Sequence, residues 1–222
     1  MLLPELYRDD RFVILDKPPG LPVHPGPRGG PSVEDSFPHL SRRRTGPWLA
    51  HRLDADTSGC LVIALRRAAL HEAQAAFAAH TVRKTYWAIV EGTPTQPQGL
   101  IDAPLLKRTA TKSWHMAIDP AGQPAQTEYR ILGQATREGR GLTWLELHPR
   151  TGRTHQVRIH CASLGTPILG DPIYAPPSDT TRLHLLARAI YLPLTPPLQA
   201  TAPPPAHMLP ALRACGWTGE TQ

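Results

Sequence analysis

Runs of hydrophobic residues along this chain predict short strands interrupted by turns. Apolar residues at 6–7 and 12–15 flank the acidic pair at 9–10, which predicts strand, turn, strand at the N-terminus. A continuous apolar run at 60–65 is typical of a buried strand, and the segment 84–90 predicts another strand. The chain therefore begins with elements of a sheet.

Helical spacing of apolar positions alternates with these strands. The segment 66–80 is rich in alanine and predicts a helix. Val157, Cys161 and Leu164 share one face of a second predicted helix, which Gly165 ends. Further elements are predicted as strands at 127–133, 142–147 and 182–194 and as a short closing helix within 205–217. Strands scattered among a few helices predict an α+β fold with a mixed sheet.

Proline and glycine mark the loops. The segment 22–47 is rich in Pro, Gly and Arg and predicts a surface loop with one helical turn from Ser32. The segment 105–125 is also expected to be a loop. With 222 residues the chain is long enough for one proper core, and we expect a single domain over 1–222 with its core at about 6–212.

Charge and cysteine content narrow the class of protein. Lys and Arg number 24 against 18 acidic residues, a net charge of +6 that favours an anionic partner such as nucleic acid but also fits a generic basic protein. The three cysteines form no CxxC pair, which argues against a disulfide framework or a zinc ribbon, and Cys60 and Cys161 are expected to be buried. Without a signal peptide or a long apolar span, we expect a soluble cytoplasmic protein.

The first candidate site is the segment HRLDADTSG at 51–59, directly before the predicted buried strand. A loop that holds Asp54 at the end of an apolar strand shields the carboxylate from water, and a nearby cation would keep it ionised as a nucleophile or base. Other interpretations stay open: Asp54 could cap a turn, Arg52 could pair with it at the surface, and His51, Asp54 and Asp56 could bind a metal.

The second candidate site is the segment RTGRTHQVRIH at 150–160, which holds three Arg and two His. If the helix begins near Thr154, His155 and Arg158 are neighbours one turn apart. A helix N-terminus surrounded by Arg binds anions, and Arg suits planar pairing with a carboxylate or phosphate. A solvated basic helix face is the alternative.

Together the segments HRLDADTSGCLVIAL, KTYWAIVEG, PAQTEYRIL, PRTGRTHQVRIHCASLGTPILGDPIY and TAPPPAHM resemble the RluA-type pseudouridine synthases, in the family's order and over about residues 6–212. The segment VILDKPPGLPVHPG is similar to the family's N-terminal segment. The resemblance implies the pseudouridine synthase fold, a mixed and mostly antiparallel sheet with flanking helices and a central cleft. It implies an isomerase that detaches uracil from its ribose in RNA, rotates it and reattaches it through carbon 5.

The resemblance also implies roles for single residues. Asp54 matches the catalytic aspartate, Arg158 the arginine that pairs with it, and Tyr86 the active-site tyrosine of the Lys-x-Tyr segment. Without the resemblance, Tyr86 would be taken for an ordinary strand aromatic. Arg52 matches the arginine that supports the space left by the extruded nucleotide, and Leu185 falls where an apolar residue lies under the uracil. Leu186, where relatives carry histidine, departs from the pattern.

His155 and Gln156 are expected to shape the pocket rather than react, and Arg153 to bind substrate. Further candidates for phosphate contact are Arg42 to Arg44, Lys107, Arg108 and Arg150, with the loops 24–47 and 105–125 clasping the RNA. The family uses neither a metal nor an organic cofactor. Because only five residues precede the first strand, we expect a compact monomeric member without the N-terminal RNA-binding domain, acting on large-subunit ribosomal RNA or transfer RNA.

Two other functions compete with this hypothesis. One is a non-catalytic RNA-binding module or RNA chaperone on the same scaffold. Binding alone needs none of Asp54, Tyr86 and Arg158, so their joint presence favours the enzyme. The other is a metal-dependent nuclease that uses Asp54 and Asp56.

Overall fold

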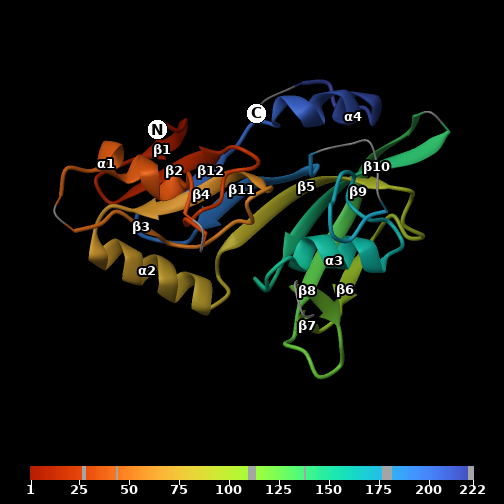
Figure 1. Cartoon of the computed structure of the whole chain (residues 1–222), viewed down its shortest axis with the longest axis horizontal. Coiled ribbons are helices and arrows are strands. Elements are labelled where there is room, and N and C mark those ends of the chain that lie inside the picture. Colours follow the sequence, from red (N-terminus) through yellow and green to blue (C-terminus); the bar gives the residue numbers. More distant parts are fainter. Residues whose placement is uncertain (27–28, 44, 110–113, 138, 177–181, 220–222) are drawn as a thin grey trace. The chain divides into compact units, whose positions relative to one another are not determined.

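The computed structural model describes residues 1–26, 29–43, 45–109, 114–137, 139–176 and 182–219. The chain divides into two compact units (Figure 1). The first comprises Met1–Lys84 and Leu186–Pro205, and the second Thr85–Leu185 and Ala206–Gln222. The chain passes between the units three times, twice inside a strand and once after Pro205, so each unit is built from two separate pieces of sequence.

The strands of the first unit are arranged around β4 (Ser58–Ala64), in which every residue is buried. β4 pairs antiparallel with β2 (Phe12–Lys17) and parallel with β11 (Leu185–Leu192). The remaining elements of this unit are β1 (Glu5–Arg8), η1 (Val33–Ser36), α1 (Phe37–Leu40), β3 (Trp48–Leu49), α2 (Arg67–Ala78) and β12 (Leu198–Thr201). The strand at 12–15, the buried strand, the helix at 66–80 and the helical turn after Ser32 are confirmed.

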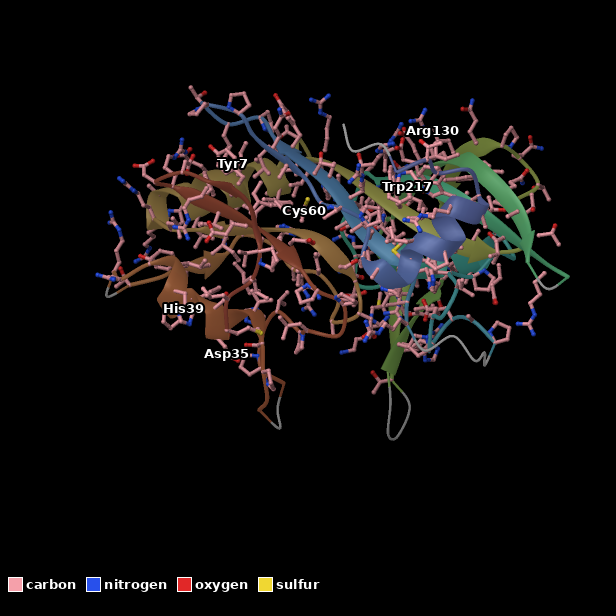
Figure 2. The ribbon with its side chains drawn as sticks, turned by 90° about the horizontal axis from the view of Figure 1, so that it is seen from above. Tyr7, Asp35, His39, Cys60, Arg130 and Trp217 are labelled. Carbon is pink, nitrogen blue, oxygen red and sulfur yellow. The ribbon has the colours of Figure 1, made fainter. Side chains whose placement is uncertain are left out.

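Gly59 explains how β11 approaches β4 so closely. Its φ of +104° lies in a region that favours glycine, and a Cβ there would lie 2.3 Å from the carbonyl oxygen of Ala187. Beside it, the thiol of Cys60 lies 3.6 Å from the carbonyl oxygens of Arg188 and Ala200, and Figure 2 shows it among the strands of this unit. Burial raises the pKa of Cys60 to about 12, which agrees with the predicted inert buried thiol.

In the second unit the strand order is β5–β10–β9–β6, from β5 (Arg83–Glu91), β10 (Arg140–Pro149), β9 (Gln126–Arg137) and β6 (Gln98–Asp102). These strands pair antiparallel from β5 through to β6. A two-stranded sheet of β7 (Leu105–Thr109) and β8 (Trp114–Ile118) stands apart from them. The unit also holds α3 (Gln156–Ser163), η2 (Ala206–Met208) and α4 (Leu209–Ala214).

The expectation of a loop at 105–125 is wrong for its first part. Leu105–Thr109 pairs antiparallel with Trp114–Ile118 as a hairpin, and 110–113 lie outside the described residues. Leu105 and Met116 are buried with Ala125 and Ile159 in a small core cluster, while Lys107 and Thr109 are exposed. One apolar residue of each strand thus packs with Ile159 of α3, which anchors the hairpin.

Helix α3 covers the main core of the second unit. Val157 and Cys161 of the helix are buried together with Leu145 and Leu147 of β10, as the apolar spacing predicts. The antiparallel pairings and few helices confirm the predicted α+β class with a mixed, mostly antiparallel sheet. None of the helices in the described part of the chain is long and apolar enough to cross a membrane.

Candidate functional site

The loop between β3 and β4 carries the first candidate site. Asp54 is half-buried there, and its carbonyl oxygen accepts the N–H of Thr57 at 3.1 Å, which closes a tight turn directly before β4. The neighbouring Leu53 is buried and anchors the loop, whereas Arg52 is exposed. The sequence prediction of a carboxylate at the start of a buried strand is therefore confirmed in its local geometry.

His51 has a structural role in the same loop. Its Nε2 accepts the N–H of Val62 at 3.0 Å, and its ring lies 5.0 Å from that of Phe77. Burial, aided by the charge of Lys84, lowers the pKa of His51 to about 4, so the imidazole is neutral. Among the described residues, no group of three or more His, Cys, Asp or Glu side chains could hold a metal ion.

Lys17 holds the backbone of this loop in place. The sequence analysis did not identify it. Its side chain is fully buried, and Nζ donates to the carbonyl oxygens of Pro18, Leu21 and Ala55 at 2.9, 2.8 and 2.7 Å. Burial lowers the pKa of Lys17 to about 8, against the opposing charges of Asp56 and Asp54. A lysine that ends the mostly apolar segment Phe12–Lys17 was the available signal, since a buried ammonium must find acceptors.

The second candidate site begins with a turn before α3. The amide of Gln156 is buried and uses both its ends: Oε1 accepts from Thr151 Oγ1 at 2.7 Å and from the N–H of Arg153 at 3.0 Å. Its Nε2 donates to the carbonyl oxygen of Gln126 at 2.9 Å and to Thr127 Oγ1 at 3.0 Å. Gln156 thus holds the turn to β9, which supports a shaping role.

The interpretation of this segment as a solvated basic face is wrong for the helix itself. Arg158 and His160 are buried because their polar atoms find partners inside the protein. His160 lies 2.9 Å from Thr127 Oγ1 and 3.1 Å from the carbonyl oxygen of Ala103. Arg153, before the helix, is half-buried, and its Nε donates to the carbonyl oxygen of Pro124 at 3.2 Å.

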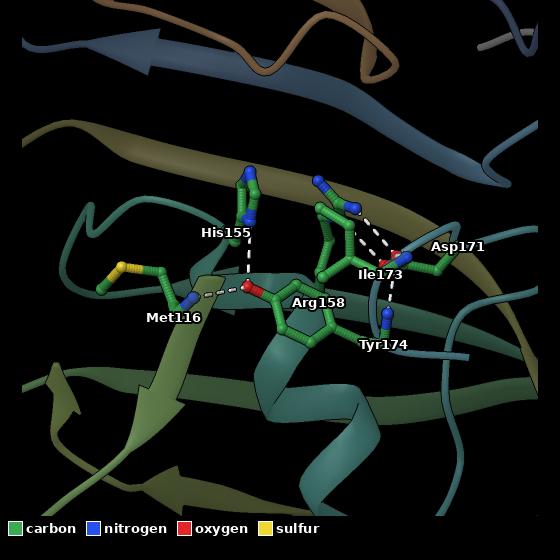
Figure 3. Close-up of polar contacts among 6 residues, drawn as sticks. All are labelled: Met116, His155, Arg158, Asp171, Ile173 and Tyr174. Atoms are coloured by element: carbon green, nitrogen blue, oxygen red, sulfur yellow. Dashed lines mark hydrogen bonds and ion pairs between the residues drawn. The ribbon is translucent and has the colours of Figure 1, made fainter. Parts of the chain in front are cut away.

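Arg158 forms a buried ion pair with Asp171, a residue the sequence analysis did not single out. Nε and Nη2 of Arg158 each lie 2.8 Å from one carboxylate oxygen of Asp171 (Figure 3). Burial opposes ionisation of Asp171, but the hydrogen bonds and charge of Arg158 outweigh it, so the pKa of Asp171 is lowered. A guanidinium has five N–H donors, so this pair is compatible with a second carboxylate partner.

Tyr174 connects this pair to its surroundings. Its hydroxyl lies 2.9 Å from Nδ1 of His155 and accepts the N–H of Met116 in β8 at 3.0 Å (Figure 3). Its ring lies 5.3 Å below Cζ of Arg158. His155 itself adopts a left-handed conformation with φ of 55° directly before α3, rather than the first helical turn expected from Thr154.

Tyr86 and Leu185 belong to the core of the second unit. Leu185 is buried in the cluster under α3, and Tyr86 on β5 is half-buried and packs against that cluster. The structure thus brings Arg158, His155, Tyr86 and Leu185 into one unit. Arg52 and Asp54 belong to the other, so the pairing of Asp54 with Arg158 stays a prediction.

The candidate phosphate contacts are exposed. Lys107 and Arg108 lie on β7, and Arg108 is paired with Asp119. Arg150 is paired with Glu128. Arg42 and Arg43 are also exposed, and Arg44 lies outside the described residues.

Comparisons with known proteins all find RNA pseudouridine synthases. The family model "RNA pseudouridylate synthase" matches residues 11–163. An uncharacterized RNA pseudouridine synthase of Zymomonas mobilis is 40% identical over 207 residues, 90% of this chain and 93% of that protein. The dual-specificity RNA pseudouridine synthase RluA of Escherichia coli is 36% identical over 86% of each chain. The structure of human RNA pseudouridylate synthase domain containing 4 is similar with a TM-score of 0.79 and 29% identity, over 95% of this chain and 92% of that one.

Proposed function

This chain belongs to the family of RNA pseudouridylate synthases and is an isomerase, and from that premise we propose that it converts specific uridines of structured RNA to pseudouridine with Asp54 as its catalytic carboxylate. The base leaves its ribose, rotates and is rejoined through carbon 5. Such a reaction needs positioning, a nucleophilic or charge-stabilising carboxylate and proton transfer.

The loop around Asp54 is the observation that carries the assignment. It lies within the part of the chain that the family model matches. The carboxylate is half-buried beside the wholly buried β4, where low water content strengthens its interaction with developing positive charge. Lys17 fixes the backbone at Ala55, so the position of Asp54 is set before substrate binds.

Three residues of the second unit complete the proposed chemistry. Arg158 pairs with Asp54 and keeps it ionised, as an adjacent arginine favours the charged carboxylate. Tyr86 stacks on the uracil and its hydroxyl moves a proton. Leu185 lies under the base. His155 and Gln156 shape the pocket. The hydrogen bonds of the buried side-chain amide of Gln156 support that role.

RNA binding is assigned to cations that are exposed or half-buried. The base must leave the helical stack to react. The side chain of Arg52 then occupies the space that the base has left in the stack. Arg153 and the cations of β7 contact phosphates, which makes binding weaken with salt. We propose large-subunit ribosomal RNA, transfer RNA or both as substrates, met in the cytoplasm by one monomeric catalytic domain. The dual-specificity name of the Escherichia coli relative supports testing both RNA pools.

Tritium release from transcripts labelled at carbon 5 of uridine tests the proposal, because that hydrogen is lost when the new bond forms. Large-subunit ribosomal RNA and total transfer RNA should be assayed separately. We expect release from at least one pool, loss of release in Asp54→Asn, and RNA affinity within a few fold of the wild type. Arg158→Ala should also lose most of its turnover and keep only a small residual rate.

Asp56→Asn is the matched control, because it removes a carboxylate from the same turn. It should retain most of the turnover. Near-normal turnover in Asp54→Asn would refute the carboxylate assignment, and binding without release from either pool would favour a non-catalytic RNA-binding protein.

A further inference from the structure

The ion pair between Arg158 and Asp171 is the most enclosed charged pair among the described ion pairs. The side chain of Arg158 is 3% exposed and that of Asp171 is fully buried. Burying two charges costs several kcal/mol of hydration per ion, and apolar residues often replace such a pair without loss of stability. A stabilising role alone is therefore a weak explanation for this pair.

The carboxylate of Asp171 is itself held rigidly. Its Oδ1 also accepts the backbone N–H of Ile173 at 2.9 Å and of Tyr174 at 3.1 Å. Both oxygens are therefore fixed by a turn of the chain and by the guanidinium together. Because Arg158 bonds through two nitrogens in one plane, this contact fixes the rotation of its guanidinium as well as its position.

The ring of Tyr174 restricts the same guanidinium from a second direction. It lies 5.3 Å from Cζ of Arg158, and the hydroxyl of the ring is anchored to His155 and to β8. An arginine side chain normally has many rotamers, and fixing one of them costs conformational entropy. Here the side chain of Arg158 is already ordered in the folded protein, so substrate binding does not have to order it.

We propose that Asp171 is a positioning residue, which holds the guanidinium of Arg158 in the one orientation that serves the catalytic carboxylate. The inference rests on the proposed function, in which Arg158 partners Asp54. Asp171 acts only through Arg158 and touches neither RNA nor the reacting atoms. Misplacement of a catalytic group by about 1 Å lowers turnover by about 100-fold, which sets the expected scale.

Asp171→Asn is the first test. Asparagine can accept the N–H groups of Ile173 and Tyr174 with its oxygen, but its NH2 then faces a donor of Arg158. We expect kcat for tritium release to fall about 10- to 100-fold, while KM for RNA changes less than about threefold. Asp102→Asn, which neutralises an exposed carboxylate of β6, is the matched control and should leave both constants unchanged.

A double mutant separates positioning from general structural damage. If Asp171 acts through Arg158, adding Asp171→Asn to Arg158→Ala should change the residual kcat less than about twofold. A purely structural role predicts that the two losses multiply and that the activity of each variant follows its folded fraction, measured by circular dichroism. Multiplied losses overturn the inference.

Asp171→Glu covers the case in which the asparagine variant does not fold. It keeps the charge but moves the carboxylate by one methylene, and a fall in kcat of about fivefold or more is expected. A folded Asp171→Glu or Asp171→Asn variant with wild-type kcat overturns the inference alone. Wild-type kcat in Arg158→Ala would instead refute the proposed role of Arg158.

Discussion

Removal of the Lys17 amine should loosen the loop that carries Asp54. Nζ of Lys17 joins two carbonyl oxygens of the following turn, those of Pro18 and Leu21, to that of Ala55, which lies 38 residues away in the sequence. Methionine in place of this lysine fills nearly the same volume without a donor. The variant Lys17→Met therefore removes these bonds and leaves the packing almost unchanged.

The expected loss follows from two opposing quantities. A hydrogen bond to a charged group contributes about 1.5–3 kcal/mol to stability, and Lys17 makes three of them. Against this, the lowered pKa of Lys17, about 8 in place of 10.5, corresponds to a burial cost of about 3 kcal/mol. Ala55 retains one partner, because its oxygen also accepts the N–H of Gly20 at 2.9 Å. We expect a net destabilisation of about 2–4 kcal/mol.

Two measurements check this expectation. Urea unfolding followed by circular dichroism should show a lower midpoint for Lys17→Met. Tritium release at a temperature where the variant is folded should show kcat reduced about 10- to 100-fold with RNA affinity within a few fold. Arg67→Met removes an exposed cation from the same unit and is the control. An unchanged midpoint together with wild-type kcat would refute the argument that the buried amine fixes the loop.

Three further variants probe the fold and the site. Gly59→Ala should lower Tm by several degrees in a thermal melt, because its methyl group would lie 2.3 Å from the oxygen of Ala187, and an unchanged Tm would contradict this. Tyr174→Phe keeps a ring against Arg158 but removes the bond at Met116, so KM for RNA should rise several-fold with a smaller fall in kcat; an unchanged KM would argue against RNA contact by this hairpin. The free energy of unfolding should decline as the pH falls from 6.5 to 4, because His51 titrates near 6.5 when unfolded and at about 4 when folded. His51→Gln should reduce that decline by at most about 3 kcal/mol, and equal slopes would contradict the assignment.

The spacing of hydrophobic residues along the sequence predicted the elements that pack on the core. The run at 60–65 became the buried β4, and the spacing of Val157, Cys161 and Leu164 became α3. The first succeeds because a continuous apolar run is typical of a strand buried on both faces, and the second because the apolar positions repeat with the period of a helix. The position of Asp54 followed from the same logic, since it directly precedes such a strand.

Partners distant in sequence could not be predicted in this way. Asp171 lies in a segment rich in Gly and Pro that resembles an ordinary loop, and its pairing with Arg158 depends on how the turn packs on α3. A buried arginine requires a carboxylate partner, but the sequence did not reveal that Arg158 is buried. A search for such a partner therefore had no starting point. The hairpin β7–β8 was missed for a related reason: only Leu105 and Met116 of its described side chains are buried, too few to show a strand pattern in the sequence.

The parallel pairing of β4 and β11 has a consequence for the synthesis of this protein on the ribosome. Ser58 pairs with Leu186, so about 130 residues must be made after Ser58 before its partner on β11 exists. At about 5–20 residues per second this interval lasts roughly 6 to 25 seconds. During that time the start of a strand that is buried in the folded protein lacks its β11 partner, and such an unpaired edge is a template for association with other chains. The nascent chain is therefore most vulnerable to aggregation until its last quarter has left the ribosome.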